Sequence, residues 1–434
     1  MRHAPAGSLL VFSALGLLAL AGCQGHGTYT QQALEAQKMK ANLLKGDVQW
    51  QMAQQQYLAG DLEKALKGVD NAIDMSPKSA KAHVLRGRIL LELGNLELAR
   101  QSFEQAGTLN PVDVDAQYFM GIVCERMTEL DEAQRRYEAA MKLDETNPQY
   151  VIAAAETMAS RNLLPEANAL LAQKSKAFPH NAGIRQLQGQ FAMLESDFGK
   201  AADLLAEARL LSPDDAGIQE ELARAQFSAQ RFGDAEFTLQ MLIKTAGATP
   251  RRDLIIMHTR CLMNLERLGE ARQALIKFTA DAEGMSDIQA WFDLGQVCIK
   301  MNDPQRVRLA GGRLVSIAPE RAEGYLLRAM FARMTSDLPA ALTAINDAIR
   351  LNPKEPSAFS IRALIAQQMG NTQQAQLDST HAAELAQLAS ATKSAAAAQT
   401  ALIRSDRLAG TGSPVAAKAP FVPAATATAS VPTE

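Results

Sequence analysis

The residues that could support catalysis or bind a metal are few and widely spaced. No two histidines beyond His3 stand four residues apart, the spacing at which one helix face presents two metal ligands. No C-x-x-C pair occurs, so neither a zinc knuckle nor a thiol redox centre is indicated. Motifs for a serine nucleophile, a zinc protease or a phosphate-binding loop are also absent. We therefore predict no enzyme, no cofactor and no metal site, and we interpret the histidines as solvated or helix-packed side chains: His26, His83, His180, His258 and His381.

One cysteine stands at a position that suggests chemical modification. Arg2 and His3 precede an apolar run from Leu9 to Leu20, and small residues then lead to Cys23. A charged start, a short apolar stretch and small residues are typical of a secretory signal peptide. The run is shorter than the roughly 20 residues that an ordinary membrane-spanning helix needs. We therefore expect residues 1–22 to be removed as a signal peptide.

The segment Leu20-Ala21-Gly22-Cys23 resembles the bacterial lipobox. That resemblance implies that Cys23 is lipidated on sulfur, that the chain is cut before it and that its new amino group is acylated. Several acyl chains would hold the protein stably on a membrane, which one chain does not. Gln24 follows, where Asp in enteric lipoproteins commonly signals retention in the inner membrane. The resemblance therefore implies a lipid-anchored envelope protein, in the outer membrane and facing the periplasm.

The elements that would position any functional residue repeat with a fixed period. Small residues, alanines and prolines recur every 34 residues, as in Gly87, Ala99, Ala106 and Pro111. The same offsets return at Gly189, Ala201, Ala208 and Pro213, and at Ala329, Ala341, Ala348 and Pro353. Small residues allow two helices to approach within about 8–10 Å, and proline ends the second helix. The repeats begin at 46, 80, 114, 148, 182, 216, 252, 288, 322 and 356, and two of them are two residues longer than the others.

This 34-residue pattern resembles the tetratricopeptide repeat, over roughly 46–389. Trp291-Phe-Asp-Leu294-Gly295 reproduces the opening of the family pattern. The resemblance implies an all-α superhelical solenoid of about ten helix-turn-helix repeats. Four repeats depart from the pattern, with large residues in place of alanine and Gly247 and Glu283 in place of proline, and these repeats would stack at altered angles. The replacing residues are Lys174, Leu242, Phe278 and Leu314.

Cys124 and Cys298 share one interior repeat position, so we predict that they and Cys261 are small buried thiols. Residues 23–45 would form a lipidated tether and a leading helix over 31–45. Residues 390–408 would continue a terminal helix that starts near 372, and 409–434 form an Ala-, Thr- and Pro-rich tail that cannot bury a core. Lys plus Arg number 44 against 47 Asp plus Glu, without a long basic block, which argues against nucleic acid as a partner.

The fold that the resemblance implies lines its concave groove with the first helix of each repeat. Chaperone-binding relatives place Lys and Asn there to hold a terminal carboxylate, and no repeat here supplies that pair. Large apolar side chains and isolated arginines fall on groove positions instead, and an adaptable, Met-rich surface suits helical or extended apolar partners. The alternative is that many of these side chains are half-buried between adjacent helices. The predicted partner-binding residues are Tyr118, Met193, Phe227, Arg224, Arg260, Phe292, Met330 and Met334.

These features favour a non-enzymatic scaffold that binds envelope proteins through its groove and is held on the membrane by Cys23. Similarity in plan to repeat lipoproteins that assist secretins and pili suggests a role in assembling a pilus, a secretin or a secretion system. A scaffold for peptidoglycan enzymes or for outer-membrane protein assembly is the alternative. No small-molecule substrate is expected.

Overall fold

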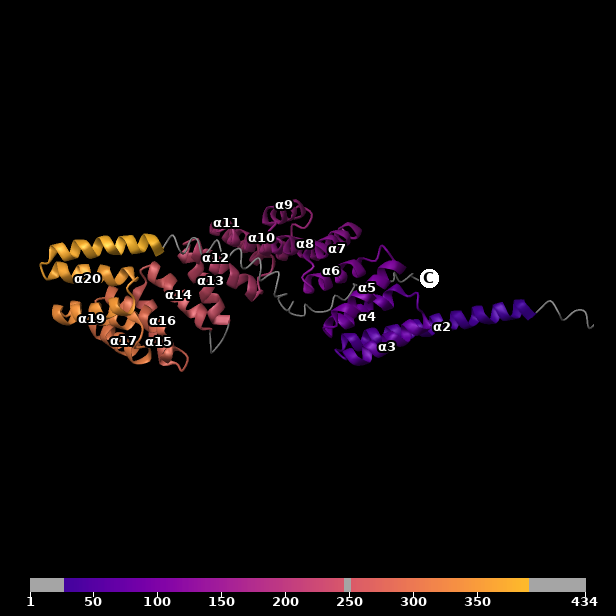
Figure 1. The fold of residues 1–434 in the computed structure, drawn as a ribbon, viewed down its shortest axis with the longest axis horizontal. Helices are drawn as coiled ribbons and strands as arrows, with labels where there is room; N and C mark the ends of the chain where they lie inside the picture. The colour runs from indigo at the N-terminus through magenta and orange to yellow at the C-terminus, as the bar shows by residue number, and fades with distance from the viewer. Residues whose placement is uncertain (1–26, 246–250, 390–434) are drawn as a thin grey trace, which may run out of the picture. The chain divides into compact units, whose positions relative to one another are not determined.

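A computed structural model describes residues 27–245 and 251–389, and these residues form helices and turns without a β-strand (Figure 1). The predicted all-α class is therefore confirmed. Cys23, residues 390–408 and the tail over 409–434 lie outside the described residues. No described helix is both long and apolar enough to cross a membrane.

The helices group into two compact units, which we call the N-terminal stack (27–161) and the C-terminal stack (162–389). The N-terminal stack contains α2 (Gly27–Leu58), α3 (Leu62–Met75), α4 (Ala80–Glu92), α5 (Leu96–Leu109), α6 (Val114–Arg126), α7 (Leu130–Leu143) and α8 (Pro148–Ser160). The C-terminal stack contains α9 (Leu164–Lys174), α10 (Ala182–Leu194), α11 (Phe198–Leu211), α12 (Ala216–Ser228), α13 (Phe232–Thr245), α14 (Arg252–Asn264), α15 (Leu268–Ala280), η1 (Gly284–Ser286), α16 (Ile288–Lys300), α17 (Pro304–Ile317), α18 (Ala322–Met334), α19 (Leu338–Leu351), α20 (Pro356–Gln368) and a last helix over 372–389.

The even-numbered helices from α4 to α20 are the first helices of their repeats, and each begins at the first residue of a predicted repeat. Within each stack, neighbouring helices pack side by side, as α4 does with α5 and α10 with α11. Carboxylate and amide side chains cap several of these starts. Asp113 Oδ1 accepts a hydrogen bond from Ala116 N at 2.9 Å, and Asn181 Oδ1 accepts one from Ile184 N at 2.9 Å. Such caps satisfy backbone donors that the first turn of a helix leaves free.

The turn between the two helices of a repeat has the same left-handed residue throughout the described chain. Gly60, Gly94 and Gly370 adopt φ of 78–82° there. Residues with a Cβ adopt φ of 53–63° at the same place in the other repeats, where the conformation is strained. The alanine and glycine pattern does not mark this position, because only three of its residues are glycine. The residues with a side chain are Thr128, Asn162, Ser196, Gln230, Glu266, Asn302 and Ser336.

Small residues lie where the two helices of a repeat come closest. A methyl group added at Gly87 would lie 2.6 Å from Phe103 Cε1, and one added at Gly189 would lie 2.6 Å from Leu205 Cγ. Phe103 and Leu205 are buried, at 2% and 0% exposure. Each bulky side chain therefore occupies the space that the facing glycine leaves open. The repeat alanines are wholly buried in the same layers: Ala99, Ala106, Ala201, Ala208, Ala341 and Ala348.

The two longer repeats place their additional residues between helices. One insertion falls between α13 and α14, and the other falls between α15 and α16, where η1 forms. Trp291 Nε1 donates to Met285 O of η1 at 3.0 Å, which fixes this loop on the core. Three of the large residues that replace alanine are buried and so fill the core directly: Leu242, Phe278 and Leu314.

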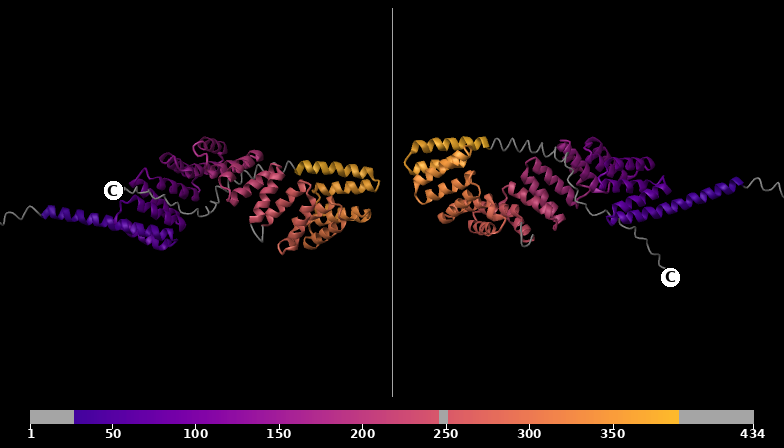
Figure 2. Two further views of the ribbon diagram at one scale, coloured as in Figure 1. Left: turned by 180° about the vertical axis from the view of Figure 1, so that it is seen from behind. Right: turned by 60° about the horizontal axis from the view of Figure 1, so that its bottom comes forward.

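Both ends of the described chain are helical. The expected leading helix over 31–45 continues without a break into the first repeat, and together they form α2 of 32 residues. Its N-terminal half extends away from the rest of the N-terminal stack, with the side chains of 31–45 exposed (Figures 1 and 2). At the other end, Arg362 Nη2 of α20 lies 2.7 Å from Asp378 Oδ1 of the helix over 372–389. Asp378 is only 3% exposed, so this ion pair fastens the last helix to α20.

Candidate partner-binding surface

Tyr118 of α6 belongs to an aromatic cluster in the N-terminal stack. Its ring centroid lies 5.3 Å from that of Phe119, 5.7 Å from that of Tyr137 and 5.1 Å from that of Tyr150. Tyr137 is buried and donates its hydroxyl to Glu125 Oε2 at 2.7 Å. Tyr118 remains partly exposed at the margin of the cluster. Burial raises the pKa of Tyr118 to about 12, so its hydroxyl stays a neutral hydrogen-bond donor.

A cleft of about 230 Å³ lies in the same stack, between α2, α4 and the start of α6. Trp50 and Val84 contribute apolar surface to it, while Lys81, Arg88 and Asp115 contribute charge. Lys81 Nζ lies 4.5 Å from the centroid of the Trp50 ring and pairs with Asp47 at 2.9 Å.

Arg88 is held between two rings at this cleft. Its guanidinium carbon lies 5.0 Å from the ring centroid of Tyr57 on α2 and 4.7 Å from that of Phe119 on α6. The sequence analysis did not assign a role to Arg88. Its aromatic neighbours come from two other repeats, and the repeat pattern alone does not place them over its side chain.

The two arginines predicted for the groove of the C-terminal stack are already paired within the chain. Arg260 Nε lies 3.2 Å from Asp293 Oδ2, and Asp293 is 3% exposed. Arg224 Nη2 lies 3.6 Å from Glu220 and 3.8 Å from Asp253. Their positive charge is therefore largely neutralised by neighbouring carboxylates.

The predicted apolar residues of the C-terminal stack lie at the margins of its core. Met193 and Phe227 are partly buried, and the ring centroid of Phe227 lies 5.6 Å from that of Phe232. Phe292 and Met334 are partly buried against the largest cluster of core residues. Met330 is only 9% exposed, which leaves it little area for a partner. These side chains thus serve packing first, and all but Met330 keep part of their surface open.

The sulfur and imidazole groups occupy structural positions. Cys124, Cys261 and Cys298 are free thiols with 0% exposure. Burial raises the pKa of Cys261 to about 12 and that of Cys298 to about 11, which keeps both as unreactive thiols. His258 Nε2 lies 3.3 Å from Glu236 Oε1. Within 27–245 and 251–389, no group of three or more histidine, cysteine or acidic side chains is arranged to hold a metal ion.

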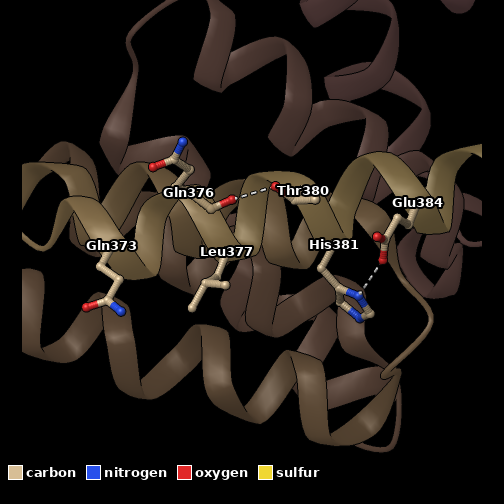
Figure 3. Close-up of a pocket in the computed structure, with 6 residues that line it drawn as sticks. All are labelled: Gln373, Gln376, Leu377, Thr380, His381 and Glu384. Carbon is tan, nitrogen blue, oxygen red and sulfur yellow. Dashed lines mark hydrogen bonds and ion pairs between the residues drawn. The ribbon is translucent and has the colours of Figure 1, made fainter.

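A second hollow, of about 420 Å³, lies along the helix over 372–389 (Figure 3). All of its described lining comes from that one helix. His381 Nδ1 lies 3.6 Å from Glu384 Oε2, and the His381 ring packs edge-on to Phe359 with centroids 4.5 Å apart. Its amide, hydroxyl and aliphatic side chains do not converge on one point, so it offers no defined binding geometry.

Models of the tetratricopeptide repeat match residues 51–113 and 192–254. Together with the paired helices, these matches identify the chain as an all-α tetratricopeptide-repeat solenoid. Repeats of this kind generally act as protein-interaction scaffolds and not as enzymes. A comparison with curated protein sequences finds no match.

Several solved structures share part of this architecture. PilW, described as a widely conserved type IV pilus biogenesis factor, is 18% identical over 47% of this chain and 94% of its own, with a TM-score of 0.42. PilF of Pseudomonas aeruginosa is 16% identical over 49% of this chain and 94% of its own, with a TM-score of 0.40. A tetratricopeptide-repeat protein of Parabacteroides merdae is 12% identical over 56% of this chain and 92% of its own, with a TM-score of 0.41.

Proposed function

We propose that this tetratricopeptide-repeat chain is a lipid-anchored scaffold that binds envelope proteins through the first helices of its repeats and assists assembly of a pilus, secretin or secretion system. The observation that supports binding there is the partial exposure of large side chains on those helices. Tyr118, Phe227 and Phe292 each keep open surface although they contact the core. Aromatic residues that are rigid on one side and open on the other are the residue types most enriched at protein interfaces.

Photocrosslinking in the native host tests the binding surface. A photoreactive phenylalanine analogue would replace Tyr118, Phe227 or Phe292, one position at a time. Matched controls are Phe237 of α13 and Leu309 of α17, which are 57% and 60% exposed on second helices. We expect specific protein adducts from the first-helix positions and none from the controls.

Adducts formed only at Phe237 or Leu309 would move the binding surface to the second helices and refute the proposal. The absence of any adduct at the three first-helix positions would refute it as well. Mass spectrometry of the adducts would identify the partner and so test the proposed role in envelope assembly.

The anchor is a separate part of the proposal, and it is supported by the lipobox-like residues before Cys23. Replacing Cys23 by Ala should abolish labelling by a palmitate analogue and release the protein from the membrane fraction, while the helical circular-dichroism signal is unchanged. A wild-type protein that is soluble and unlabelled would refute the anchor without bearing on the groove.

A further inference from the structure

The charged groups of the cleft in the N-terminal stack are unevenly paired. Lys81 pairs with Asp47, and Arg86 of the same helix pairs with Asp70 at 2.7 Å. Arg88 forms no ion pair within the described residues, and its Nε is buried without a hydrogen-bond partner. A guanidinium carries five donors and is always charged, so a buried nitrogen without an acceptor is costly in the free protein.

The rings around Arg88 determine which direction remains open to a ligand. Tyr57 and Phe119 stack near its guanidinium, at 5.0 and 4.7 Å from the ring centroids. The Tyr57 hydroxyl donates to Glu92 Oε1, which fixes that ring in place. Stacking uses the flat faces of a guanidinium and leaves its edge, with the N–H donors, for an acceptor in the same plane.

Asp115 lies at the cleft without neutralising Arg88. It lines the same space but forms no ion pair with the guanidinium among the described contacts. Burial raises the pKa of Asp115, and the positive charge of Arg88 opposes that rise. The cleft therefore holds a fixed cation whose donors are not satisfied by its nearest carboxylate.

We infer that Arg88 anchors a carboxylate of an extended partner peptide, an acidic side chain or a free C-terminus, with Trp50 and Val84 contacting an adjoining apolar residue. A carboxylate matches the planar fork of a guanidinium through two parallel hydrogen bonds. A space of about 230 Å³ suits one or two side chains and not a folded surface. This inference deepens the proposed function and rests on it, because it names the chemistry of a partner in the N-terminal stack.

A random peptide library displayed on phage and selected against the purified full chain provides the test. We expect the enriched peptides to share an acidic residue or a free C-terminus at one position. Synthetic versions of an enriched peptide, labelled with fluorescein, would then be titrated by fluorescence anisotropy. Changing its acidic residue to the amide, or changing Arg88→Met, should weaken binding at least about tenfold. Arg88→Lys should recover only part of the affinity, because an ammonium lacks the planar fork.

Asp115→Asn gives a control of opposite sign that does not touch the stacked rings. Removing this negative charge should tighten binding of the acidic peptide by a few-fold, whereas a merely structural role of Arg88 predicts no change. Circular dichroism should show equal helix content in all variants.

The inference is overturned if the selection enriches no peptide, if the enriched peptides lack an acidic group, or if Arg88→Met binds them unchanged. A phosphoserine peptide that binds more than tenfold tighter than its glutamate counterpart would also overturn it. Crosslinks at Tyr118, Phe227 and Phe292 that persist in Arg88→Met would then show that the scaffold function stands while the carboxylate anchor does not.

Discussion

Two glycine-to-alanine changes in the C-terminal stack should have opposite effects on stability. Gly189 lies within α10, and a methyl group there would lie 2.6 Å from Leu205 Cγ and 3.1 Å from its Cδ2. Leu205 is 0% exposed and packs in a cluster with Leu222 and Ala201, so it has little room to move. Gly312 lies within α17, and a methyl group there meets no atom within 4 Å.

The magnitude follows from the terms that the two variants share. Both substitutions gain helix propensity of about 1 kcal/mol, because alanine replaces glycine inside a helix. This gain cancels when the two are compared. The difference between them therefore isolates the cost of overpacking at Gly189, which we expect to be about 1–3 kcal/mol. Gly312→Ala should be slightly stabilising by itself.

Tryptophan fluorescence during urea denaturation provides the assay. The chain has two tryptophans, and Trp50→Phe leaves only Trp291, which reports on the C-terminal stack. Comparing variants within one stack is appropriate because long repeat arrays need not unfold in a single step.

A double-mutant cycle adds a second check. Leu205→Ala removes the atoms that Gly189→Ala would meet, at a cost of about 2–5 kcal/mol for the cavity. In that background Gly189→Ala should become stabilising. Equal effects of Gly189→Ala and Gly312→Ala, or no coupling with Leu205, would refute the packing assigned to the repeat glycines.

Three further predictions concern the turns, a helix cap and the thiols. Thr128→Gly should raise stability by about 1 kcal/mol, because a β-branched residue is strained at its φ of 63°; urea midpoints measure this, and an unchanged midpoint would contradict the strain. Asp287→Ala should cost about 0.5–2 kcal/mol at pH 7, since Asp287 Oδ1 caps α16 by accepting from Ala290 N at 2.8 Å. Burial opposes ionisation of Asp287, but Arg252 and the backbone donors hold its pKa below the usual 3.8. Its charged form therefore adds stability that is present above pH 4 or so and is lost as pH falls through the folded pKa, so wild type and variant should converge at about pH 3; a gap that persists there would exclude this linkage. Finally, Cys124, Cys261 and Cys298 should react with Ellman's reagent only on unfolding, without the rise between pH 7 and 9 that an exposed thiol shows, because burial raises the pKa of each; fast reaction in the native protein would show that the helices open locally.

The sequence by itself determined the helical repeats and their register. Glycine and alanine at fixed offsets are needed wherever two helices come close, and this short-range requirement recurs in every repeat. Gly87 facing Phe103 and Gly189 facing Leu205 are direct consequences of it. The signal-like segment before Cys23 can also be recognised from sequence, although it lies outside the described residues.

Tertiary structure decided which groove residues remain available. Met330 and Phe292 fall on groove positions by count, yet how much of each is open depends on the neighbouring helices that pack against it. Arg224 and Arg260 appear isolated in sequence but meet carboxylates from other segments at 3.2–3.8 Å. Arg88 shows the reverse, because its rings come from helices on either side while no carboxylate reaches it. Charge pairing depends on contacts between repeats, and a pattern within one repeat does not contain that information.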